Sequence, residues 1–505
     1  MIEGTAKSYW MASTGTTSYP RLTDDIEVDV AIVGGGIAGV AAAWELTRAG
    51  RPAVLLEADR LAAGVTGHTT GRLSAAHPWI YAPLRDSLGA EAARLYATSQ
   101  QEAVDHVVET AGALGIDCDI ERRPSHVYVE SPDRVEALRT EAEAARDAGL
   151  AVSFGTETDL PYDVAGVMRV EEQVQFHPRR FLLGLAEDFI RRGGQVYERT
   201  RVVTIDEGGP HRLRTDTGVT VTARDVVVAT LFPVIEHALL DFRLVPLREL
   251  VIAAPIPADH DPGGMFITRD ENTRSVRTAP YRDGQRLLLI TGESFPPGGG
   301  DEDERHRRLV DWARELFKIN GVDFWWSAQD LNTTDKIPYV GQFADHLYVA
   351  TGYARSGLSH GIMSGRLLAG LLTGTEPPWT GLYAPRRTHP AREAVPIVKA
   401  GLANAHRFVG DRLRVRRASI EDIKPGEGAV IRHAGRPCAV FRDDGGTAHV
   451  LSARCPHLGC LVAFNDTERV WECPCHGSRF ATDGSVLTGP ATKPLSHQAA
   501  EPLSR

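Results

Sequence analysis

The clearest pattern of apolar and polar positions lies near the N-terminus, in EVDVAIVGGGIAGVAAAWELTRAGRPAVLLEADR (residues 27–60). An apolar run at 28–33 predicts a buried strand, and apolar residues then recur at helical spacing until Gly50 ends the helix. A second apolar run, 53–56, closes with Glu57. This order of strand, glycine-rich turn, helix and strand predicts a βαβ unit of an α/β domain.

Three later segments extend this α/β pattern. Residues 175–205 predict a His-Pro turn, a long helix and a strand, and residues 223–230 predict a buried strand. Residues 346–374 predict a strand, a glycine-rich turn and a further helix. We therefore expect one large N-terminal unit over residues 1–389.

The period of the pattern changes to two near the C-terminus. Residues 428–443 alternate and turn at Gly435, and residues 447–453 alternate again. Short strands separated by glycine-rich turns predict a small all-β domain, over residues 417–505. Between the two units, apolar residues at near-helical spacing predict a bridging amphipathic helix (390–416) that packs between domains, because its polar face carries both signs of charge.

Composition fits a soluble globular protein of two or three domains. The chain has 505 residues, which is too long for one core, and 42% of them are hydrophobic. A net charge of -10 argues against nucleic-acid binding and against a polybasic membrane surface. No apolar run approaches the ~20 residues that span a bilayer, and the first residues lack the apolar core of a signal peptide. We expect a cytoplasmic protein.

The turn of the βαβ unit has the spacing G-x-G-x-x-G, at Gly34, Gly36 and Gly39. Gly34 permits the tight turn, Gly36 lets a pyrophosphate approach the backbone, and Gly39 packs the helix against the strand. Glu57 would accept hydrogen bonds from ribose hydroxyls. The sequence contains no second unit of this kind, so we expect one dinucleotide-binding site. The Gly/Thr-rich loop 61–77 favours FAD over NAD, and the electrons must then come from an organic substrate or another protein.

Four of the six cysteines fall between Cys455 and Cys475, which in a cytosolic chain favours a metal site over scattered disulfides. CPHLGC (455–460) and CPCHGSRF (473–480) supply Cys-x-His and Cys-x-x-His. Two thiolates and two imidazoles could hold structural zinc. A second interleaved cysteine pair, the Gly-Ser after the last histidine and the turn at Gly489-Pro490 argue against zinc.

This pattern resembles the Rieske [2Fe-2S] domain. The resemblance implies that Cys455 and Cys473 bind one iron and that His457 and His476 bind the other. It also matches Cys460 and Cys475 to the cysteines that tie the two cluster loops together in high-potential members, and their oxidation state in a cytosol is left open. Ser478 matches a residue that hydrogen-bonds a cluster sulfur. Phe480 stands where high-potential members have tyrosine, so we expect an intermediate potential.

Residues 25–390 resemble the superfamily of D-amino-acid oxidase, sarcosine oxidase and dimethylglycine dehydrogenase. The resemblance implies an FAD-binding Rossmann-type α/β domain and an α+β substrate domain, the latter from about 81–165 and 240–325. It places Val203 at the adenine, and Thr351, Gly352, Gly357 and Leu358 near the flavin pyrimidine ring. In the loop that contains Thr66 and Thr69, His68 falls in register with a histidine that carries covalent flavin in some members. A loop histidine that only contacts the flavin or a phosphate is the alternative.

Substrate contacts are harder to assign. Gln329 and Asp330 lie just before the flavin segment and would face the flavin if the resemblance holds. An arginine and a tyrosine would suit a substrate carboxylate, for which Arg248 and Tyr281 are candidates. Further candidates are Tyr128, Arg277 and Lys336.

These features predict an FAD-dependent amine or amino-acid dehydrogenase, with N-demethylation as one such reaction. Electrons would pass from flavin through the Rieske cluster to an external one-electron acceptor such as a ferredoxin, a cytochrome or a quinone-linked protein. The alternatives are an electron carrier without an amine substrate, and a redox sensor that uses Cys460 and Cys475. A Rieske oxygenase is disfavoured, because the sequence offers no clear two-histidine, one-carboxylate iron site and only 29 residues follow His476.

Overall fold

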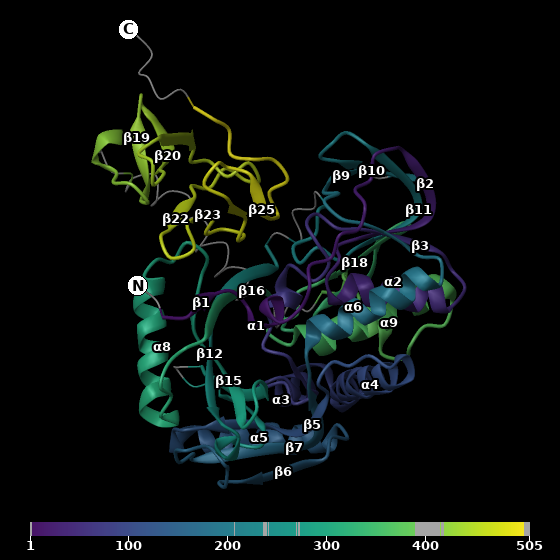
Figure 1. Cartoon of the computed structure of the whole chain (residues 1–505). Helices are drawn as coiled ribbons and strands as arrows, with labels where there is room; N and C mark the ends of the chain where they lie inside the picture. Colours follow the sequence, from purple (N-terminus) through teal and green to yellow (C-terminus); the bar gives the residue numbers. More distant parts are fainter. Residues whose placement is uncertain are drawn as a thin grey trace.

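The computed structural model describes residues 3–206, 208–235, 240, 242–268, 270, 273–388, 415 and 419–498. The predicted bridging helix at 390–416 therefore lies almost wholly outside the described residues. Figure 1 shows three regions: a sheet with helices at the right, a long curved sheet at the lower left, and a small β domain above them.

The first region is an eight-stranded sheet, here called the parallel sheet, because neighbours in its order β18-β11-β2-β3-β8 run parallel. It confirms the α/β fold class. In the same sheet, β10 pairs antiparallel with β11, and β9 pairs antiparallel with β10. The strands are β2 (Ile26–Val33), β3 (Ala53–Leu56), β8 (Gln195–Tyr197), β9 (Val202–Asp206), β10 (His211–Thr215), β11 (Thr220–Val228), β17 (Tyr339–Ala344) and β18 (Leu347–Thr351).

Helices cover the parallel sheet, which explains why β2 changes from alternating to fully buried along its length. Two of them pack closely: a Cβ on Gly365 of α9 would lie 2.5 Å from the Ala41 side chain of α2. Gly50 ends α2, since its N–H bonds Thr47 and that of Arg51 bonds Leu46, a Schellman pair. The helices of this region are α2 (Ile37–Arg48), α3 (Tyr81–Leu88), α4 (Ala90–Leu114), α6 (Pro178–Arg191), α9 (Gly357–Thr373) and α10 (Thr380–Tyr383).

The second region is a ten-stranded mixed sheet, in the order β1-β16-β12-β15-β14-β13-β5-β7-β4 with β6 beside β7. Helix α8 (Glu302–Phe317) packs against it through Leu309, Val310 and Ala313. Its strands reach Gln175 and Thr333, past the ranges expected for the substrate domain. They are β1 (Thr5–Ala6), β4 (Arg72–Leu73), β5 (Glu121–Val129), β6 (Val152–Gly155), β7 (Gly166–Gln175), β12 (Leu244–Pro257), β13 (Met265–Thr268), β14 (Ser275–Pro280), β15 (Gln285–Phe295) and β16 (Phe324–Thr333).

The third region, here called the C-terminal domain, is all β, as predicted. It has an antiparallel three-stranded sheet, β19-β20-β21, and a four-stranded one, β22-β23-β24-β25. Cys438 is a buried free thiol in β20. The strands are β19 (Gly428–His433), β20 (Arg436–Arg442), β21 (Ala448–Ser452), β22 (Ala463–Asn465), β23 (Val470–Glu472), β24 (Arg479–Phe480) and β25 (Val486–Thr488).

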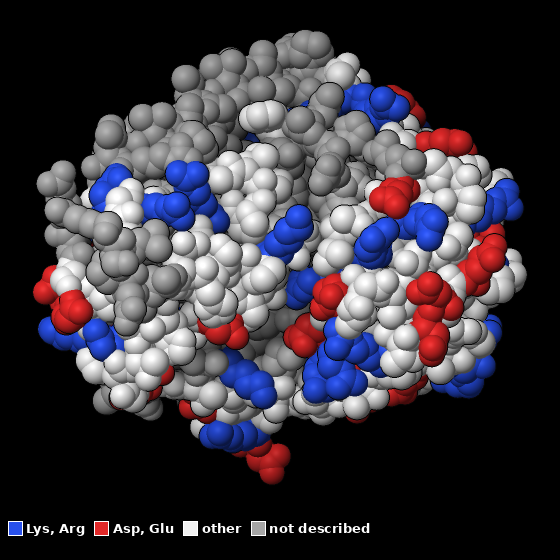
Figure 2. Space-filling view, turned by 90° about the horizontal axis from the view of Figure 1, so that it is seen from above, with Lys and Arg blue, Asp and Glu red and all other residues white. Residues whose placement is uncertain are grey.

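The remaining helices of the described structure are α1 (Tyr9–Ala12), α5 (Val135–Asp147) and the 3-10 turns Val65–His68, Pro132–Arg134, Ala258–His260 and Ile420–Asp422. None of the helices in the described residues is both long enough and apolar enough to cross a membrane. Acidic and basic side chains are interspersed over the face shown in Figure 2.

Candidate functional site

A cavity of about 760 Å³ opens where the parallel strands end. Val33, Leu56, Ala229 and Thr351 line it, at or just beyond the carboxyl ends of β2, β3, β11 and β18. Ligands of open parallel sheets bind at this edge. The ten-stranded sheet and the C-terminal domain supply the remaining walls, so three regions enclose one site.

The glycine-rich turn has the geometry that its spacing predicts. Gly34 has φ +112°, and a Cβ there would lie 2.5 Å from the Ala229 carbonyl oxygen. A Cβ on Gly39 would lie 1.9 Å from the Gly34 carbonyl oxygen, so α2 sits against β2 only with glycine at that place. Gly36 lines the cavity, and a Cβ at that position would meet only the Thr66 hydroxyl, at 3.4 Å. This open cradle fits a pyrophosphate.

Polar side chains form hydrogen bonds with the backbone at the N-terminus of α2. The Thr66 hydroxyl accepts a hydrogen bond from the Ile37 N–H (3.0 Å) at the first turn of the helix. The Glu57 carboxylate accepts from the Gly35 N–H (2.6 Å) and the Asp59 N–H (2.8 Å). Burial raises the pKa of Glu57. A carboxylate has about four acceptor positions, so Glu57 retains capacity for ribose hydroxyls.

His68 lies on the cavity wall together with Thr69. Its Nδ1–H donates to the Gly64 carbonyl oxygen (2.8 Å), which leaves Nε2 with the lone pair. Burial lowers the pKa of His68, so the ring is neutral near pH 7. The Trp326 indole N–H holds the His68 carbonyl oxygen (2.7 Å). A neutral imidazole facing the cavity is compatible with either flavin contact or flavin attachment.

The segment before α9 and the first turn of that helix also line the cavity. Gly352 (φ +79°), Gly357 and Leu358 line it, and α9 begins there. Val203 does not line the cavity. Its neighbour Val202 does, and the expected contact of Val203 with the adenine stays a prediction.

Gln329 and Asp330 of β16 both line the cavity, as expected. Asp330 is half-buried and accepts hydrogen bonds from the Leu331 N–H (2.7 Å) and the Arg355 N–H, and desolvation raises its pKa to about 6. Nearby on the same wall, Arg355 pairs with Glu249 (2.9 Å). No sequence motif marks this pair, although Arg355 lies within the glycine-rich turn at 352–357.

Arg248 and Tyr281 are not brought to the cavity, which corrects their assignment as substrate contacts. The Tyr281 hydroxyl donates to Asp323 (2.5 Å) at the far end of β16. Arg248 is 1% exposed and is surrounded by carboxylates. The weaker candidates also lie off the cavity wall: Tyr128 bonds the Tyr162 hydroxyl (2.7 Å), Arg277 bonds the Gly71 carbonyl oxygen (3.0 Å), and Lys336 is exposed.

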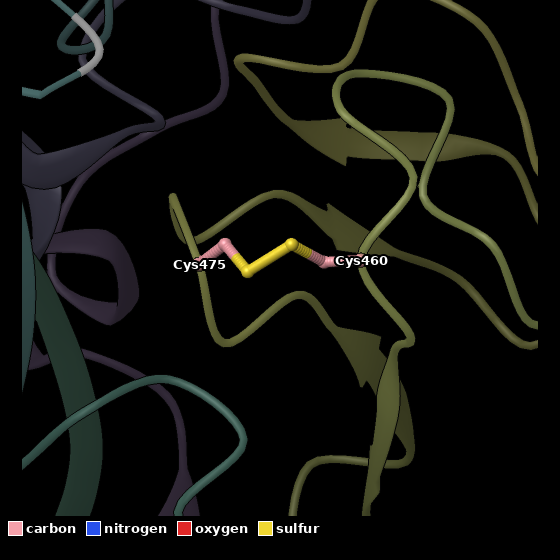
Figure 3. The surroundings of a disulfide bond; sticks show 2 residues. All are labelled: Cys460 and Cys475. Carbon is pink, nitrogen blue, oxygen red and sulfur yellow. A yellow bond between two sulfur atoms is a disulfide. The ribbon is translucent and has the colours of Figure 1, made fainter. Parts of the chain in front are cut away.

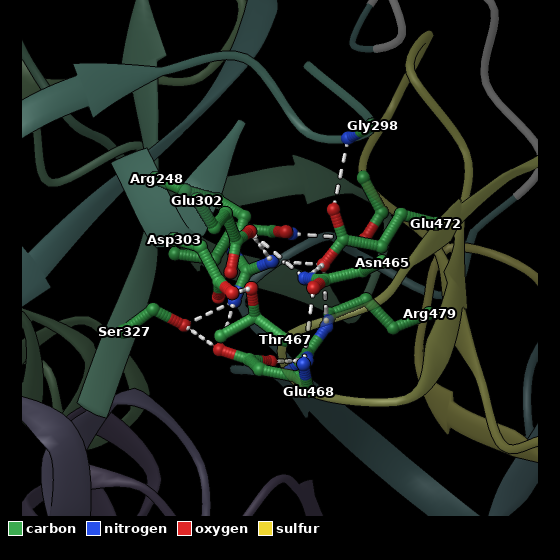
Figure 4. Close-up of polar contacts among 12 residues, drawn as sticks. Arg248, Gly298, Glu302, Asp303, Ser327, Asn465, Thr467, Glu468, Glu472 and Arg479 are labelled. Atoms are coloured by element: carbon green, nitrogen blue, oxygen red, sulfur yellow. Dashed lines mark hydrogen bonds and ion pairs between the residues drawn. The ribbon is translucent and has the colours of Figure 1, made fainter. Parts of the chain in front are cut away.

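Arg248 is the centre of an ion cluster that joins the C-terminal domain to the ten-stranded sheet (Figure 4). It pairs with Glu302 of α8 (3.0 Å) and with Glu468 (2.7 Å) and Glu472 of the C-terminal domain. Although burial opposes the charge, these carboxylates raise the pKa of Arg248, whereas burial raises the pKa of Glu302 to about 8. Asn465 and Arg479 complete the cluster through further bonds to its carboxylates. Such a buried network holds the two regions in one arrangement.

The two cysteine-rich segments form matching loops. In the first, the Gly459 N–H bonds the Cys455 carbonyl oxygen, and in the second the Gly477 N–H bonds that of Cys473, both at 2.9 Å. Both glycines have φ +77°, a conformation that side chains disfavour. The pairs Cys455/Cys473 and Gly459/Gly477 thus occupy equivalent places in the two loops.

The four expected metal ligands converge between these loops. The His457 and His476 rings lie 5.0 Å apart, nearly perpendicular. Cys455 and Cys473 are buried free thiols, and the Cys473 thiol beside it lowers the pKa of Cys455. Two paired imidazoles next to two unlinked thiols fit a cluster with one histidine-bound and one cysteine-bound iron.

Cys460 and Cys475 form a disulfide between the two loops (Figure 3). In that view the Cys475 end lies toward ribbons of the N-terminal regions, and the Cys460 end lies within the C-terminal domain. The Ser478 hydroxyl is a hydrogen-bond partner of Cys455 and accepts from the Ala491 N–H (3.0 Å). Phe480 is fully buried in the core of the domain.

Sequence reasoning missed Phe232, which follows β11. It lines the cavity, and its ring lies 6.0 Å from the His457 ring and 5.8 Å from the His476 ring. Gln329 makes a second link, because its amide donates to the Gly477 carbonyl oxygen (3.0 Å). Neither contact has a sequence signal, since each joins residues from different domains.

Comparison with known families gives two matches. Residues 29–371 match the model of the FAD dependent oxidoreductases, and residues 414–499 match the Rieske [2Fe-2S] domain. The first match covers the parallel sheet, the ten-stranded sheet and the cavity between them. The second covers the two metal-ligand loops.

Known proteins share one or both parts. The chain is 33% identical to the "Putative Rieske 2Fe-2S iron-sulfur protein YhfW" of Bacillus subtilis, over 97% of each chain. It is 27% identical to gamma-glutamylputrescine oxidoreductase of Escherichia coli, over 74% of this chain and 90% of that one. The crystal structure of glycine oxidase from Geobacillus kaustophilus has the same fold (TM-score 0.58, 21% identity), over 72% of this chain and 99% of that one.

Proposed function

Because the chain belongs to the family of FAD dependent oxidoreductases and ends in a Rieske [2Fe-2S] domain, we propose that it is a dehydrogenase that oxidises a C–N bond of a small amine or amino acid and passes the electrons through the Rieske cluster to an external acceptor. The enzyme class and both cofactors follow from the two family matches. The substrate class, the direction of electron flow and the acceptor are the proposal.

One observation carries the proposal: the Rieske domain forms part of the cavity that would hold FAD. Thr467, Glu468, Arg479 and residues 487–492 lie on its wall, together with the glycine-rich turn. An iron–sulfur domain that served another purpose would not need to enclose the flavin. Its cluster loops contact the flavin side through Phe232 and Gln329.

The cofactor-binding roles rest on the cavity geometry. Gly34, Gly36 and Gly39 would cradle the pyrophosphate at the N-terminus of α2, where helix N–H groups favour negative charge. Glu57 would hold the ribose. Further wall residues would contact the flavin or the adenine: Thr66, His68, Thr69, Val202, Gly352, Gly357 and Leu358. Cys455, Cys473, His457 and His476 would hold the cluster.

The substrate would bind where β16 meets the α9 turn. Asp330 is the best candidate for the reactive carboxylate, because a pKa of about 6 lets it receive a proton or hold an ammonium group near neutral pH. Bound FAD would accept a hydride from the carbon next to nitrogen. Hydrolysis of the resulting imine would then yield a carbonyl compound and an amine. The names of two relatives, gamma-glutamylputrescine oxidoreductase and glycine oxidase, support this substrate class.

The decisive experiment is anaerobic mixing of the holoenzyme with small amines and amino acids, including N-methylglycines, proline derivatives and polyamines. Flavin absorbance and the Rieske EPR signal would be followed together. We expect one compound to bleach the flavin and the cluster signal to appear afterwards. The control is the holoenzyme mixed with buffer alone, which should show neither flavin bleaching nor a cluster signal.

If no compound reduces the flavin but a reduced ferredoxin does, the protein is an electron carrier and the proposal fails. The electron donor would then be sought among reduced ferredoxins, cytochromes and quinone-linked proteins. The cytoplasmic location expected from the sequence stays a prediction.

A further inference from the structure

Phe232 occupies the boundary between the flavin cavity and the cluster loops. It is 4% exposed and forms part of the cavity wall. Its ring meets His457 at an interplanar angle of 70° and His476 at 75°, so one phenyl group lies edge-on against both histidines. Aromatic pairs favour this arrangement over face-to-face stacking.

The turn that carries Phe232 is held in an unusual conformation. The Thr230 hydroxyl donates to the Phe232 carbonyl oxygen (2.7 Å), and the Thr351 hydroxyl donates to the Leu231 carbonyl oxygen. Leu231 has φ +63°, a left-handed conformation that residues with a side chain disfavour. Such a conformation persists only where its surroundings enforce it, and it often marks a functional position. The turn is therefore built to hold this ring in place.

We propose that Phe232 is the residue that couples the flavin electronically to the Rieske cluster. The inference rests on the proposed function, because it assumes that electrons pass between the two cofactors. Packed atoms transmit an electron better than a gap of the same length, and the phenyl ring spans the wall between the cavity and the two imidazoles. The Gln329 amide reaches only the backbone of Gly477, so we assign it to positioning the loop.

The electron count fits a relay of this kind. Oxidation of one C–N bond releases two electrons and two protons, and a [2Fe-2S] cluster accepts one electron as one ferric iron becomes ferrous. The two electrons must therefore pass Phe232 one after the other. Each is handed to a one-electron external acceptor, and the two protons leave to solvent.

The test uses the full chain with both cofactors bound. Flavin would be photoreduced by a light flash with EDTA as the electron donor, and reduction of the cluster would be followed optically and by freeze-quench EPR. We expect Phe232→Leu to slow the electron transfer to the cluster about tenfold or more. Phe232→Met, which fills similar volume without a ring, should do the same, and Phe232→Tyr should restore most of the rate.

Three further readouts separate coupling from a merely structural effect. The midpoint potential and EPR g values of the cluster, and the flavin content, should be unchanged in these variants. Phe343→Leu is the matched control, because Phe343 is a buried phenylalanine of the same hydrophobic cluster that does not line the cavity. It should transfer electrons at the wild-type rate.

The outcomes distinguish this inference from the proposed function. Wild-type transfer rates in both Phe232→Leu and Phe232→Met would overturn the role of Phe232 and leave the relay intact. Failure of the photoreduced wild-type flavin to reduce the cluster would overturn the relay, and with it the inference. A shifted cluster potential in the variants, with rates that follow the potential, would show that Phe232 only shapes the site.

Discussion

The side-chain amide of Gln329 donates a 3.0 Å hydrogen bond to the carbonyl oxygen of Gly477, across the boundary between two domains. Gln329 lines the cavity proposed for FAD, and Gly477 directly follows His476, a proposed ligand of the cluster. One side chain therefore touches the surroundings of both cofactors. The docked arrangement of the Rieske domain makes the following predictions testable.

Two glycines of the dinucleotide turn should respond differently to substitution. Gly36→Val should leave the chain folded but deprive it of FAD, because the added side chain meets little protein and fills the phosphate cradle. Gly39→Val should fail to fold, because its Cβ would lie 1.9 Å from the Gly34 carbonyl oxygen. The ratio of flavin to protein absorbance and the circular dichroism spectrum measure the two effects. Normal flavin content in Gly36→Val would contradict the proposed site.

Asp330 should determine how the rate of flavin reduction by substrate falls at acidic pH. With a pKa raised to about 6 by burial, its carboxyl is protonated at pH 5 and ionised at pH 7, so the rate of flavin reduction by substrate should rise through that range. Asp330→Asn should remove this pH dependence and lower the rate by about 10²- to 10⁴-fold. Stopped-flow reduction between pH 5 and 8 is the measurement, with flavin content as the control. An unchanged pH profile in the variant would exclude the role.

Arg248 should be needed to keep the Rieske domain docked. Arg248→Met leaves the carboxylates of Glu302, Glu468 and Glu472 without their shared cation, and we expect a loss of about 3–5 kcal/mol. Urea unfolding followed by the cluster's visible circular dichroism measures it. The matched control is Arg21→Met, whose exposed pair with Asp216 should contribute only about 0–1 kcal/mol. Equal losses in both variants would refute the prediction.

Glu302 should make docking weaker at alkaline pH. Its folded-state pKa of about 8 lies above the ordinary value near 4.3, so the folded state favours the protonated carboxyl. The stability that this carboxyl contributes to folding is fully present below about pH 4 and is lost as pH rises through 8. Because glutamine does not ionise, the unfolding free energy of Glu302→Gln should fall less over that pH range than that of the wild type. Unfolding free energies of both proteins at pH 5, 7 and 9 would show the difference. Parallel curves would mean that Glu302 does not hold a proton in the folded state.

The disulfide between Cys460 and Cys475 should stabilise the loops without acting as a switch. It closes a segment with a sequence separation of 15, for which chain entropy gives about 3 kcal/mol. Replacing both cysteines by serine should lower the stability of the Rieske domain by that order, measured as above. Turnover at low temperature should persist. If the double variant instead turned over normally but no longer responded to oxidants, the redox-sensor alternative would gain support.

Local patterns predicted the elements more reliably than the contacts between them. The strand 53–56 and the helix that Gly50 ends appear as expected, because burial period and a glycine cap act within a few residues. The two proposed histidine ligands also lie side by side, because the four proposed ligands fall within two short loops. Arg248 was misassigned, because an arginine on a strand looks the same whether its partner is a substrate or, as here, Glu302 and Glu472 from elsewhere in the chain.

Phe232 shows why a contact between two domains could not be predicted from the sequence. Nothing in its neighbourhood distinguishes it from an ordinary core phenylalanine, and only the docking of a domain more than 200 residues away gives it two histidine neighbours.

The wall that the Rieske domain contributes to the flavin cavity also has a consequence for biogenesis. Folding of that domain depends on its metal ligands, so a chain made without iron would present an incomplete enclosure to FAD. Cells starved of iron should therefore accumulate a form of this protein that is poor in flavin as well as in iron. Supplying iron alone should then restore both prosthetic groups.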